Sequence, residues 1–372
     1  MMWIKATGVA VLAAITLTLF LAATEPDATP TPAADLEERA ASIEVNPRHS
    51  EALRTYVTSL LARAGDEQQV LPGEDGWLFL ASELKHLAAD RFWGEAAAAV
   101  STASNDAWAD PLPAIVDFNE QVDKAGARLI FVPVPPKAAI YPDKLPGSAV
   151  DQAPAARVDA THARFVELLR ESGVEVLDLT PVFLAHRQQN PDDGDDRLYC
   201  RTDTHWSPLA CKLTAQLLHQ RIGEVVELPE AGPLAYALAQ RTLKINGDLR
   251  QMQDEPTVPQ EKLPAWLVSA GDQGPPADDR DSPVLMVGDS HLLVYHVGGD
   301  MHARGAGVAD HLGRLLGGPV DVVGVRGSGA SPSRIALFRR RDELAGKKVV
   351  IWCLTAREFT QTTGWRKVPI VR

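Results

Sequence analysis

The last third of the chain alternates short apolar runs with stretches of helical periodicity. The runs at 284–287, 320–325 and 348–354 each have the length of a buried strand, and the segments at 308–316 and 333–344 between them have helical spacing. Strands that alternate with helices form a mostly parallel sheet that is covered on both faces. The pattern therefore predicts a doubly wound α/β core with three layers.

The same alternation begins well before this third and extends the predicted sheet. A helix over about 155–171 precedes an apolar run at 174–179, and a further helix is expected from Pro208 onward. Residues 224–281 are rich in Pro, Asp and Gln and show no clear period, so we expect loops there. We assign residues 67–372 to one α/β domain.

The N-terminus has the features of an export signal or membrane anchor. Lys5 precedes an almost unbroken apolar run at 6–23, a length between that of a signal-peptide core and the roughly 20 residues of a spanning helix. The residues before Ala23 fit a cleavage site poorly, so we favour an uncleaved anchor over 1–25. A linker and a short helical segment follow at 26–66. The domain is then expected outside the cytoplasm, in the periplasm of a Gram-negative source, anchored to the inner membrane.

The charge of the chain argues against nucleic acid as a partner. The formal net charge is −12 and the sequence pI is about 5.3, whereas binding to phosphates needs a basic surface that releases counterions. An acidic polymer would likewise have to be bound by a local basic site rather than by the net charge.

A candidate nucleophile follows the apolar run at 284–287. The run leads directly into Gly288-Asp289-Ser290, so the serine is expected at the carboxyl end of a strand, where ligands bind in open α/β sheets. A turn there can direct the hydroxyl outward while the backbone N–H faces a substrate oxygen. Gly-Asp-Ser is also a common turn sequence, so the motif is weak by itself.

A serine nucleophile needs a base, and the sequence offers His205 two residues after Asp203. A carboxylate at that spacing can accept the Nδ1–H of the imidazole and leave Nε2 to take the serine proton. Surface turns also produce Asp-x-His, so this motif too is weak alone. The cysteines at 200 and 211 flank the pair; a disulfide and two buried thiols are equally compatible with the spacing, whereas Cys353 lies in an apolar run and is expected in the core.

Taken together, these motifs resemble the AlgX/AlgJ alginate O-acetyltransferase family, whose catalytic domain is similar to a circularly permuted SGNH hydrolase. The resemblance rests on the order of the acid-histidine pair before the serine and on further segments along the chain. These are 73–79, 132–137, Tyr141-Pro142, 201–207, 246–249, 288–290, 323–330 and 351–358.

The resemblance implies a catalytic triad of Ser290, His205 and Asp203. It also implies an oxyanion hole made by the backbone N–H groups of Ser290 and Gly327, with Gly329 as the alternative to Gly327. Arg357 stands where the family has an asparagine, so it either donates to the oxyanion or forms a salt bridge with a carboxylate such as Glu358. Four residues near the motifs are candidates for substrate binding: Lys137, Tyr141, Trp206 and His291. For Lys137 an exposed surface position is the competing interpretation.

The implied function is O-acetylation of an exported, alginate-like polysaccharide through an acetyl-serine, without a cofactor. The acetyl donor would be delivered across the membrane, through a membrane-bound acyltransferase partner. Three alternatives remain open from the sequence. The same residues would serve a periplasmic esterase; Asp203, His205, Asp289 and His291 could bind a metal ion instead; or the domain could be a non-catalytic scaffold of an envelope complex.

Overall fold

The computed structural model describes residues 33–147, 156–191, 194–229, 236–253, 258–271 and 274–372. The predicted N-terminal anchor lies outside these residues. Residues Thr31–Arg372 form one compact unit. Among the described residues, no helix combines the length and the apolar character that crossing a membrane requires.

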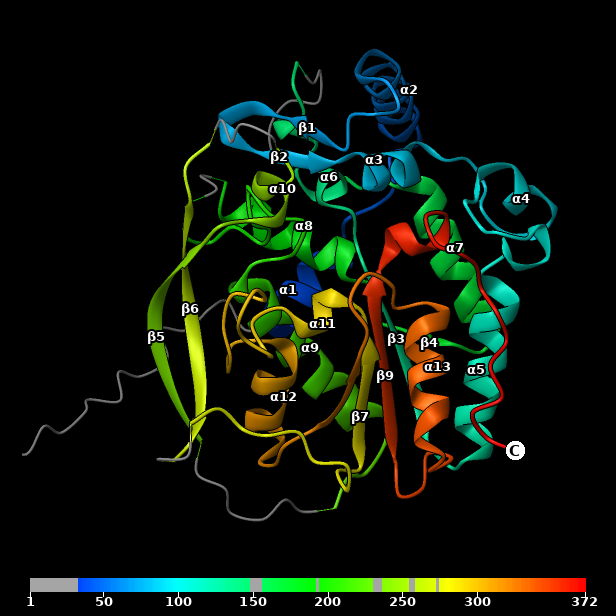
Figure 1. The fold of residues 1–372 in the computed structure, drawn as a ribbon, viewed down its shortest axis with the longest axis vertical. Helices are drawn as coiled ribbons and strands as arrows, with labels where there is room; N and C mark the ends of the chain where they lie inside the picture. Colours follow the sequence, from blue (N-terminus) through cyan, green and yellow to red (C-terminus); the bar gives the residue numbers. More distant parts are fainter. Residues whose placement is uncertain (1–32, 148–155, 192–193, 230–235, 254–257, 272–273) are drawn as a thin grey trace, which may run out of the picture. The chain divides into compact units, whose positions relative to one another are not determined.

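A five-stranded parallel sheet forms the centre of this unit (Figure 1). Its strand order is β4-β3-β9-β7-β8, and every neighbouring pair is parallel. The strands are β3 (Arg128–Val134), β4 (Glu175–Val176), β7 (Val284–Gly288), β8 (Asp321–Gly324) and β9 (Val349–Thr355). The predicted doubly wound α/β fold is therefore confirmed, and the carboxyl ends of β7 and β9 lie next to each other.

Alternate residues of each strand point to opposite faces of the sheet and enter two separate cores. Phe131, Val287 and Trp352 belong to one core, with side chains of α5 (Leu112–Lys124), α7 (Ala160–Glu171) and α13 (Ser331–Arg340). The neighbouring strand residues belong to the other core, with α8 (Leu179–Gln189), α9 (Pro208–Val225) and α12 (Val308–Leu316). Figure 1 shows the two groups of helices on opposite sides of β9. Burial on both faces explains why these strands read as continuous apolar runs.

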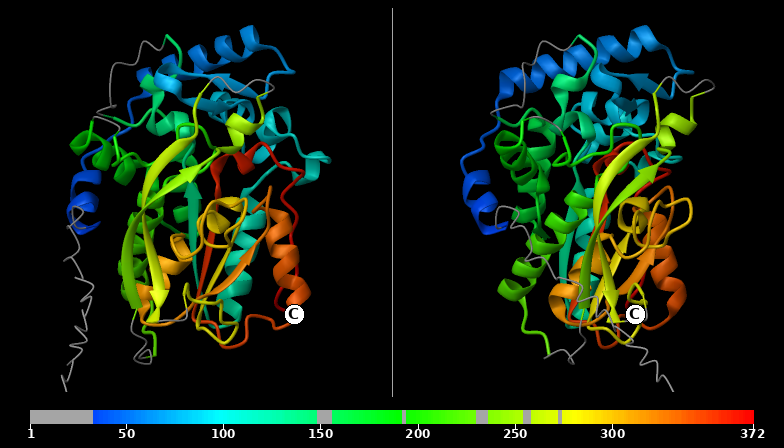
Figure 2. Two further views of the ribbon diagram at one scale, coloured as in Figure 1. Left: turned by 60° about the vertical axis from the view of Figure 1, so that its left-hand side comes forward. Right: turned by 90° about the vertical axis from the view of Figure 1, so that its left-hand side faces the viewer.

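Two predictions from the sequence need correction. The run at 174–179 forms only a two-residue strand, because the Asp178 side chain accepts a hydrogen bond from the Thr180 N–H and so starts α8. The expected loops at 224–281 contain the ten-residue strands β5 (Tyr236–Ile245) and β6 (Glu261–Ala270), which pair antiparallel. This ribbon packs mainly on α9 and α12 through β6, and most residues of β5 are exposed or half-buried, so its composition resembles that of a loop. Figure 2 shows the ribbon along the outside of these helices.

The segments before the sheet cover the carboxyl ends of its strands. Helix α3 (Ala81–Ala88) packs on α2 (Pro47–Ala64) and on the 3-10 helix η6 (Ala356–Phe359) that follows β9. The remaining elements are α1 (Ala33–Ala40), the hairpin of β1 (Val70–Pro72) and β2 (Leu78–Leu80), and the short helices η1 (Glu74–Gly76), η2 (Gly94–Ala96), α4 (Ala97–Val100), η3 (Asp106–Trp108), α6 (Lys137–Ile140), η4 (Pro142–Lys144), α10 (Asp248–Gln251) and α11 (Ser290–Leu293).

Gly247, directly before α10, should be intolerant of any side chain. Its φ is +63°, and a Cβ there would overlap the carbonyl oxygen of Thr202. We expect Gly247→Ala to lower the free energy of unfolding by about 1–3 kcal/mol, because left-handed strain and steric overlap act together. Urea denaturation followed by circular dichroism measures this change.

The matched control is Gly223→Ala in α9, where an added Cβ meets no heavy atom within 4 Å. Alanine is the better helix former, so this variant should be as stable as the wild type or more stable by about 0.5–1 kcal/mol. Equal stability of the two variants would show that Gly247 is not required for the backbone at Thr202.

Candidate active site

Ser290 lies at the carboxyl end of β7, as the first residue of α11. The preceding residue, Asp289, caps this helix and connects it to the next strand. One carboxylate oxygen of Asp289 accepts the His291 N–H at 2.8 Å, and the other accepts the Thr355 N–H at 2.8 Å. Burial opposes ionisation of Asp289, but its interactions with His291 and Thr355 lower the pKa of its carboxyl to about 2. An ionised carboxylate therefore fixes the turn that carries Ser290.

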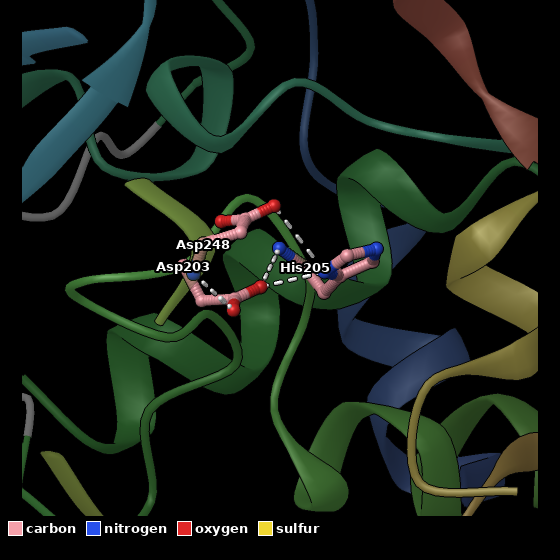
Figure 3. A group of neighbouring side chains, drawn as sticks. All are labelled: Asp203, His205 and Asp248. Atoms are coloured by element: carbon pink, nitrogen blue, oxygen red, sulfur yellow. Dashed lines mark hydrogen bonds and ion pairs between the residues drawn. The ribbon is translucent and has the colours of Figure 1, made fainter. Parts of the chain in front are cut away.

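Asp203 and His205 form a buried hydrogen-bonded pair (Figure 3). The Nδ1 atom of His205 lies 2.6 Å from Oδ1 of Asp203, and the same oxygen accepts the backbone N–H of His205 at 3.0 Å. Burial alone would lower the pKa of His205, but the Asp203 carboxylate outweighs it and raises that pKa above its ordinary value. Burial would likewise raise the pKa of Asp203, yet His205 and His302 hold it well below its usual range. The pair is thus an ionised carboxylate that orients a basic imidazole.

The Asp203 loop (residues 198–207) is held in place by buried charged groups from other parts of the chain. The Glu261 carboxylate, at the start of β6, accepts the N–H groups of Arg201 at 2.9 Å and Thr202 at 3.1 Å. The Lys137 ammonium donates to the Asp203 carbonyl oxygen at 2.6 Å and to that of Leu78 at 2.9 Å. The position of the pair therefore depends on β6, β2 and α6.

His291 connects the Asp203 loop to the Ser290 turn. The ring centroids of His205 and His291 are 4.8 Å apart, and the Trp206 indole donates to the His291 carbonyl at 3.0 Å. The structure thus brings Asp203 and His205 to the strand end that carries Ser290. Among the described residues no hydrogen bond joins Ser290 to His205, and the buried Nε2 of His205 has no partner there.

Several buried polar atoms in this region lack a hydrogen-bond partner within the described part of the chain. They are Nε2 of His205, Nε2 of His291, Oγ1 of Thr355 and Nη1 of Arg357, whereas Nδ1 of His291 lies 3.5 Å from Oδ1 of Asp289. A buried polar group without a partner costs about 1–3 kcal/mol, so these atoms would gain from a partner that a ligand or solvent supplies. They lie near the ends of β7 and β9, where ligands bind in open α/β sheets.

The two glycines considered for the oxyanion hole differ in their surroundings. Gly329 packs against Asp289, and its N–H donates to Oε1 of Glu358 at 3.3 Å. Gly327 is exposed in a turn with a φ of +87°, and the hydrogen bonds described for the chain leave its N–H unpaired. The N–H of Gly327 is therefore available to a ligand, whereas that of Gly329 is not.

Arg357 forms no salt bridge with Glu358 in the described structure. Glu358 instead accepts the Ser328 hydroxyl at 2.7 Å, and burial raises the pKa of its carboxyl to about 7. Arg357 lies close enough to Asp289 and His291 for its charge to lower the pKa of both groups. Its guanidinium therefore adds positive charge beside Ser290.

Two of the predicted substrate-binding residues are placed differently from expectation. Lys137 is fully buried rather than exposed, so it cannot reach a polymer carboxylate. Tyr141 is buried as well: its hydroxyl accepts the Leu198 N–H at 2.9 Å, and its ring packs on Trp77. Both residues support the Asp203 loop. Trp206 and His291 are also buried, but they lie beside His205.

The cysteines at 200 and 211 are free buried thiols rather than a disulfide, and Cys353 is buried in β9 as expected. The Cys200 sulfur lies 3.0 Å from the Tyr295 hydroxyl. The Asp203 loop is therefore fixed by hydrogen bonds and buried charges.

Three groups in the described chain could offer ligands to a metal ion, namely Asp203, His205 and Asp248, whose ligand atoms lie within 4.8 Å of one another (Figure 3). The predicted set of Asp203, His205, Asp289 and His291 is not brought together as one such group. Both oxygens of Asp203 already accept hydrogen bonds, and those of Asp248 accept the N–H and the hydroxyl of Thr204. The oxygens of both carboxylates therefore already have hydrogen-bond donors and do not need a metal ion as a partner.

The sequence motifs missed three residues of this region: Glu261, His302 and the side chain of Asp248. The segment Asn246-Gly247-Asp248 was recognised as a motif, but the contact made by the Asp248 side chain was not predicted. Glu261 begins a strand whose polar composition predicted a loop. His302 lies in a glycine-rich segment with no period, and it meets Asp203 across 99 positions of the sequence. No local pattern could have identified it.

Comparison with known proteins supports the fold. Residues 70–356 match the family described as SGNH hydrolase-like domain, acetyltransferase AlgX. The chain belongs to this family. It is similar to proteins named probable alginate O-acetylase AlgJ, being 29% identical over 182 residues to the one from Pseudomonas aeruginosa and 28% over 163 residues to the one from Azotobacter vinelandii. These matches cover 48% and 44% of the chain, but only 40% and 36% of those relatives.

Two solved structures share the fold of this family member. The O-acetyltransferase domain of Pseudomonas putida AlgJ superposes with a TM-score of 0.57 at 21% identity, covering 79% of the chain and 93% of that domain. Pseudomonas aeruginosa AlgX gives a TM-score of 0.56 at 15% identity, covering 81% of the chain and 65% of AlgX. At these identities the likeness establishes the SGNH hydrolase-like fold.

The raised pKa of His205 depends on the charge of Asp203 and should fall without it. In Asp203→Asn the imidazole remains buried but loses the carboxylate, so its titration should move to lower pH than in the wild type. NMR of ¹⁵N-labelled histidine side chains measures this titration directly.

Asp310→Asn is the matched control, because Asp310 pairs with His296 at 3.1 Å and not with His205. This variant should move the titration of His296 and leave that of His205 unchanged. An unchanged His205 titration in Asp203→Asn would contradict the assigned pair.

Proposed function

We propose that this chain is an O-acetyltransferase that acetylates hydroxyl groups of an exported, alginate-like polysaccharide. The observation that carries the proposal is the buried pair of Asp203 and His205, packed against the residue that follows Ser290, with Nε2 of the imidazole unpaired. Membership of the AlgX acetyltransferase family supports the reaction class, and the relatives named alginate O-acetylase support the acceptor.

The first half of the proposed reaction transfers acetyl from a donor to Ser290. Nε2 of His205 accepts the hydroxyl proton as Oγ of Ser290 attacks the acetyl carbonyl carbon. The tetrahedral intermediate collapses, the bond to the donor oxygen or sulfur breaks, and His205 returns the proton to the leaving group. Asp203 stabilises the imidazolium throughout and keeps it oriented.

The second half passes acetyl to the polymer. A sugar hydroxyl attacks the carbonyl of acetyl-Ser290 while His205 accepts its proton, and collapse of the second intermediate releases the sugar ester and restores the Ser290 hydroxyl. If water attacks instead, the same residues hydrolyse the ester. Transferase and esterase activities therefore differ only in the acceptor that reaches the acetyl-serine.

The oxyanion of each intermediate would be bound by the backbone N–H groups of Ser290 and Gly327 and by the Arg357 guanidinium. The first is at the N-terminus of α11, the second is unpaired in the described structure, and the third has an unpartnered Nη1 atom. A cationic donor at this position would stabilise the developing charge more strongly than a neutral amide does. His291 and Trp206 would form the wall beside the acyl group.

We further propose that residues 1–25 anchor the protein to the inner membrane and place the domain in the periplasm. Acetyl groups would then have to be carried across the membrane before they reach Ser290. A membrane-bound acyltransferase that presents an acetyl ester or thioester is the partner whose chemistry fits this need.

The proposal is tested with an acetyl ester donor, supplied with and without an oligosaccharide acceptor. We expect the acetylated oligosaccharide as product and, without acceptor, a mass increase of one acetyl group on the peptide that contains Ser290. Ser290→Ala should lose the adduct and lower turnover by about 10³-fold or more, because the covalent route is closed.

Each of three results would favour a different function for this chain. Release of acetate that does not respond to the acceptor would favour the esterase. Turnover that survives in Ser290→Ala and is abolished by chelators would favour a metal site. A wild-type protein that never labels at Ser290, with acetyl donors or with a fluorophosphonate, would favour a scaffold.

The role of Arg357 is tested by Arg357→Gln. We expect kcat to fall by about 10²-fold with little change in KM, because the guanidinium acts on charge that develops only in the transition state. Steady-state kinetics with the same donor and acceptor measure this. Arg339→Gln, which removes an exposed arginine from α13, is the control and should match the wild type. An unchanged kcat in Arg357→Gln would remove Arg357 from the oxyanion hole.

A further inference from the structure

A second histidine contacts the carboxylate of Asp203 from the opposite side to His205. Nε2 of His302 lies 2.9 Å from Oδ2 of Asp203, and the same oxygen accepts the Asp248 N–H at 2.8 Å. The His302 side chain is only 9% exposed. Its backbone has a φ of +69°, which is uncommon for a residue other than glycine.

His302 belongs to the 294–307 loop, which joins α11 to α12. The ring of His296 anchors this loop between two carboxylates, 2.9 Å from Asp278 and 3.1 Å from Asp310. In the middle of the loop, Asp300 forms an ion pair with Arg326 at 2.6 Å. The loop therefore begins shortly after Ser290 in the sequence. Its His302 contacts Asp203, and its Asp300 pairs with Arg326, which lies in the turn that contains Gly327.

Four hydrogen bonds complete the environment of the Asp203 carboxylate. Oδ1 accepts the Nδ1–H and the backbone N–H of His205, and Oδ2 accepts the Asp248 N–H and faces Nε2 of His302. A carboxylate offers about four acceptor positions, so all of them are used. Asp203 is fully buried, which means that bulk water cannot replace a missing donor.

We propose that His302 is a positioning residue for the acyl transfer, acting through Asp203. By donating its Nε2–H to Oδ2, it prevents the carboxylate from rotating and withdraws part of its charge from His205. Loss of that donor has two consequences. The hydrogen bond between Asp203 and His205 becomes less well oriented, and more negative charge acts on His205, so its imidazole becomes more basic. The inference rests on the proposed roles of Ser290 and His205.

Among the described residues, the charged or titratable groups that interact with His302 or with its partner Asp203 come from three elements. From its own loop these are Asp300 and the Tyr295 ring, whose centroid lies 5.7 Å from that of His302. From the Asp203 loop it is Asp203, and from α10 it is Asp248, which approaches through its backbone N–H.

The test compares His302→Leu, which removes the donor, with His302→Gln, whose side-chain amide can place an N–H near the position of Nε2. We expect kcat of the leucine variant to fall roughly ten- to a hundredfold, the range that a hydrogen bond to a charged group spans, with little change in KM. The acidic limb of its pH profile should move to higher pH, because a more basic His205 stays protonated longer as pH rises. The glutamine variant should recover most of the activity and the wild-type limb.

One further variant controls the comparison. Val297→Ala changes a 40% exposed residue of the same loop and should behave as wild type. Thermal unfolding shows whether each variant is folded. If His302→Leu does not fold, His302→Asn takes its place, because its amide is too short to reach Asp203 and its polar side chain is compatible with the partly exposed loop.

The inference and the proposed function fail in different ways. Wild-type kcat and pH profile in His302→Leu would overturn the inference alone, and so would a folded glutamine variant that is no better than the leucine variant. If wild-type Ser290 never becomes acetylated, the proposed function fails. The NMR titration of His205 then still decides whether His302 controls its basicity, because it requires no turnover: a higher midpoint in the leucine variant than in the glutamine variant supports the inference, and equal midpoints overturn it.

Discussion

The buried carboxylate of Asp203 is the constraint on which the rest of the structure depends. Removing a charge from water costs several kcal/mol unless other groups compensate for it, and here the compensation comes from separate parts of the chain. His205 belongs to the same loop, Asp248 to the end of the β5–β6 ribbon, and His302 to the 294–307 loop. These segments must all be in place before the charge is stable. The environment of the Asp203 carboxylate is therefore complete only when all three segments are in place.

The degree of hydrogen bonding separates supporting groups from candidate reactive groups. Asp203, Asp289 and Glu261 are buried carboxylates whose oxygens accept hydrogen bonds from several donors, and they fix backbone on both sides of the site. His205 is buried and Arg357 is half-buried, yet each keeps a buried nitrogen without a partner among the described residues. The three carboxylates therefore have no free acceptor position for a substrate. His205 and Arg357 can still form a hydrogen bond to a substrate, and they lie at the strand ends where the fold places a ligand.

Local patterns predicted the elements whose apolar residues recur with the period of a buried strand or helix. Helix α12 was predicted with both its ends, and β7 was placed correctly up to Ser290, because burial on both faces of the sheet leaves an apolar run that is easy to recognise. The contact between Asp203 and His205 spans two residues, so its spacing was visible in the sequence. The burial of a polar side chain by a distant segment was not visible in the sequence. Lys137 meets the Asp203 loop across 66 positions, and a lysine after two prolines has the appearance of a surface residue.

The β5–β6 ribbon escaped prediction for a related reason. It contacts the molecule with one face only, so its sequence lacks the apolar content of the central strands, although it delivers both Glu261 and the Gly247 turn to the Asp203 loop. Residues that only support a site carry no chemical signature of their own. They become recognisable only when the three-dimensional contacts are known.

The burial of Lys137 would protect an acetylated Ser290 from a side reaction with this amine. A serine that carries an acetyl ester is open to attack by any neighbouring amine, and the amide that results would be permanent. Lys137 donates to the backbone carbonyl of Asp203, so its amino group is in direct contact with the residue that orients the proposed base His205. With its nitrogen bound between two carbonyls and none of its surface exposed, it can supply positive charge to the Asp203 loop while an incoming acetyl group cannot reach it.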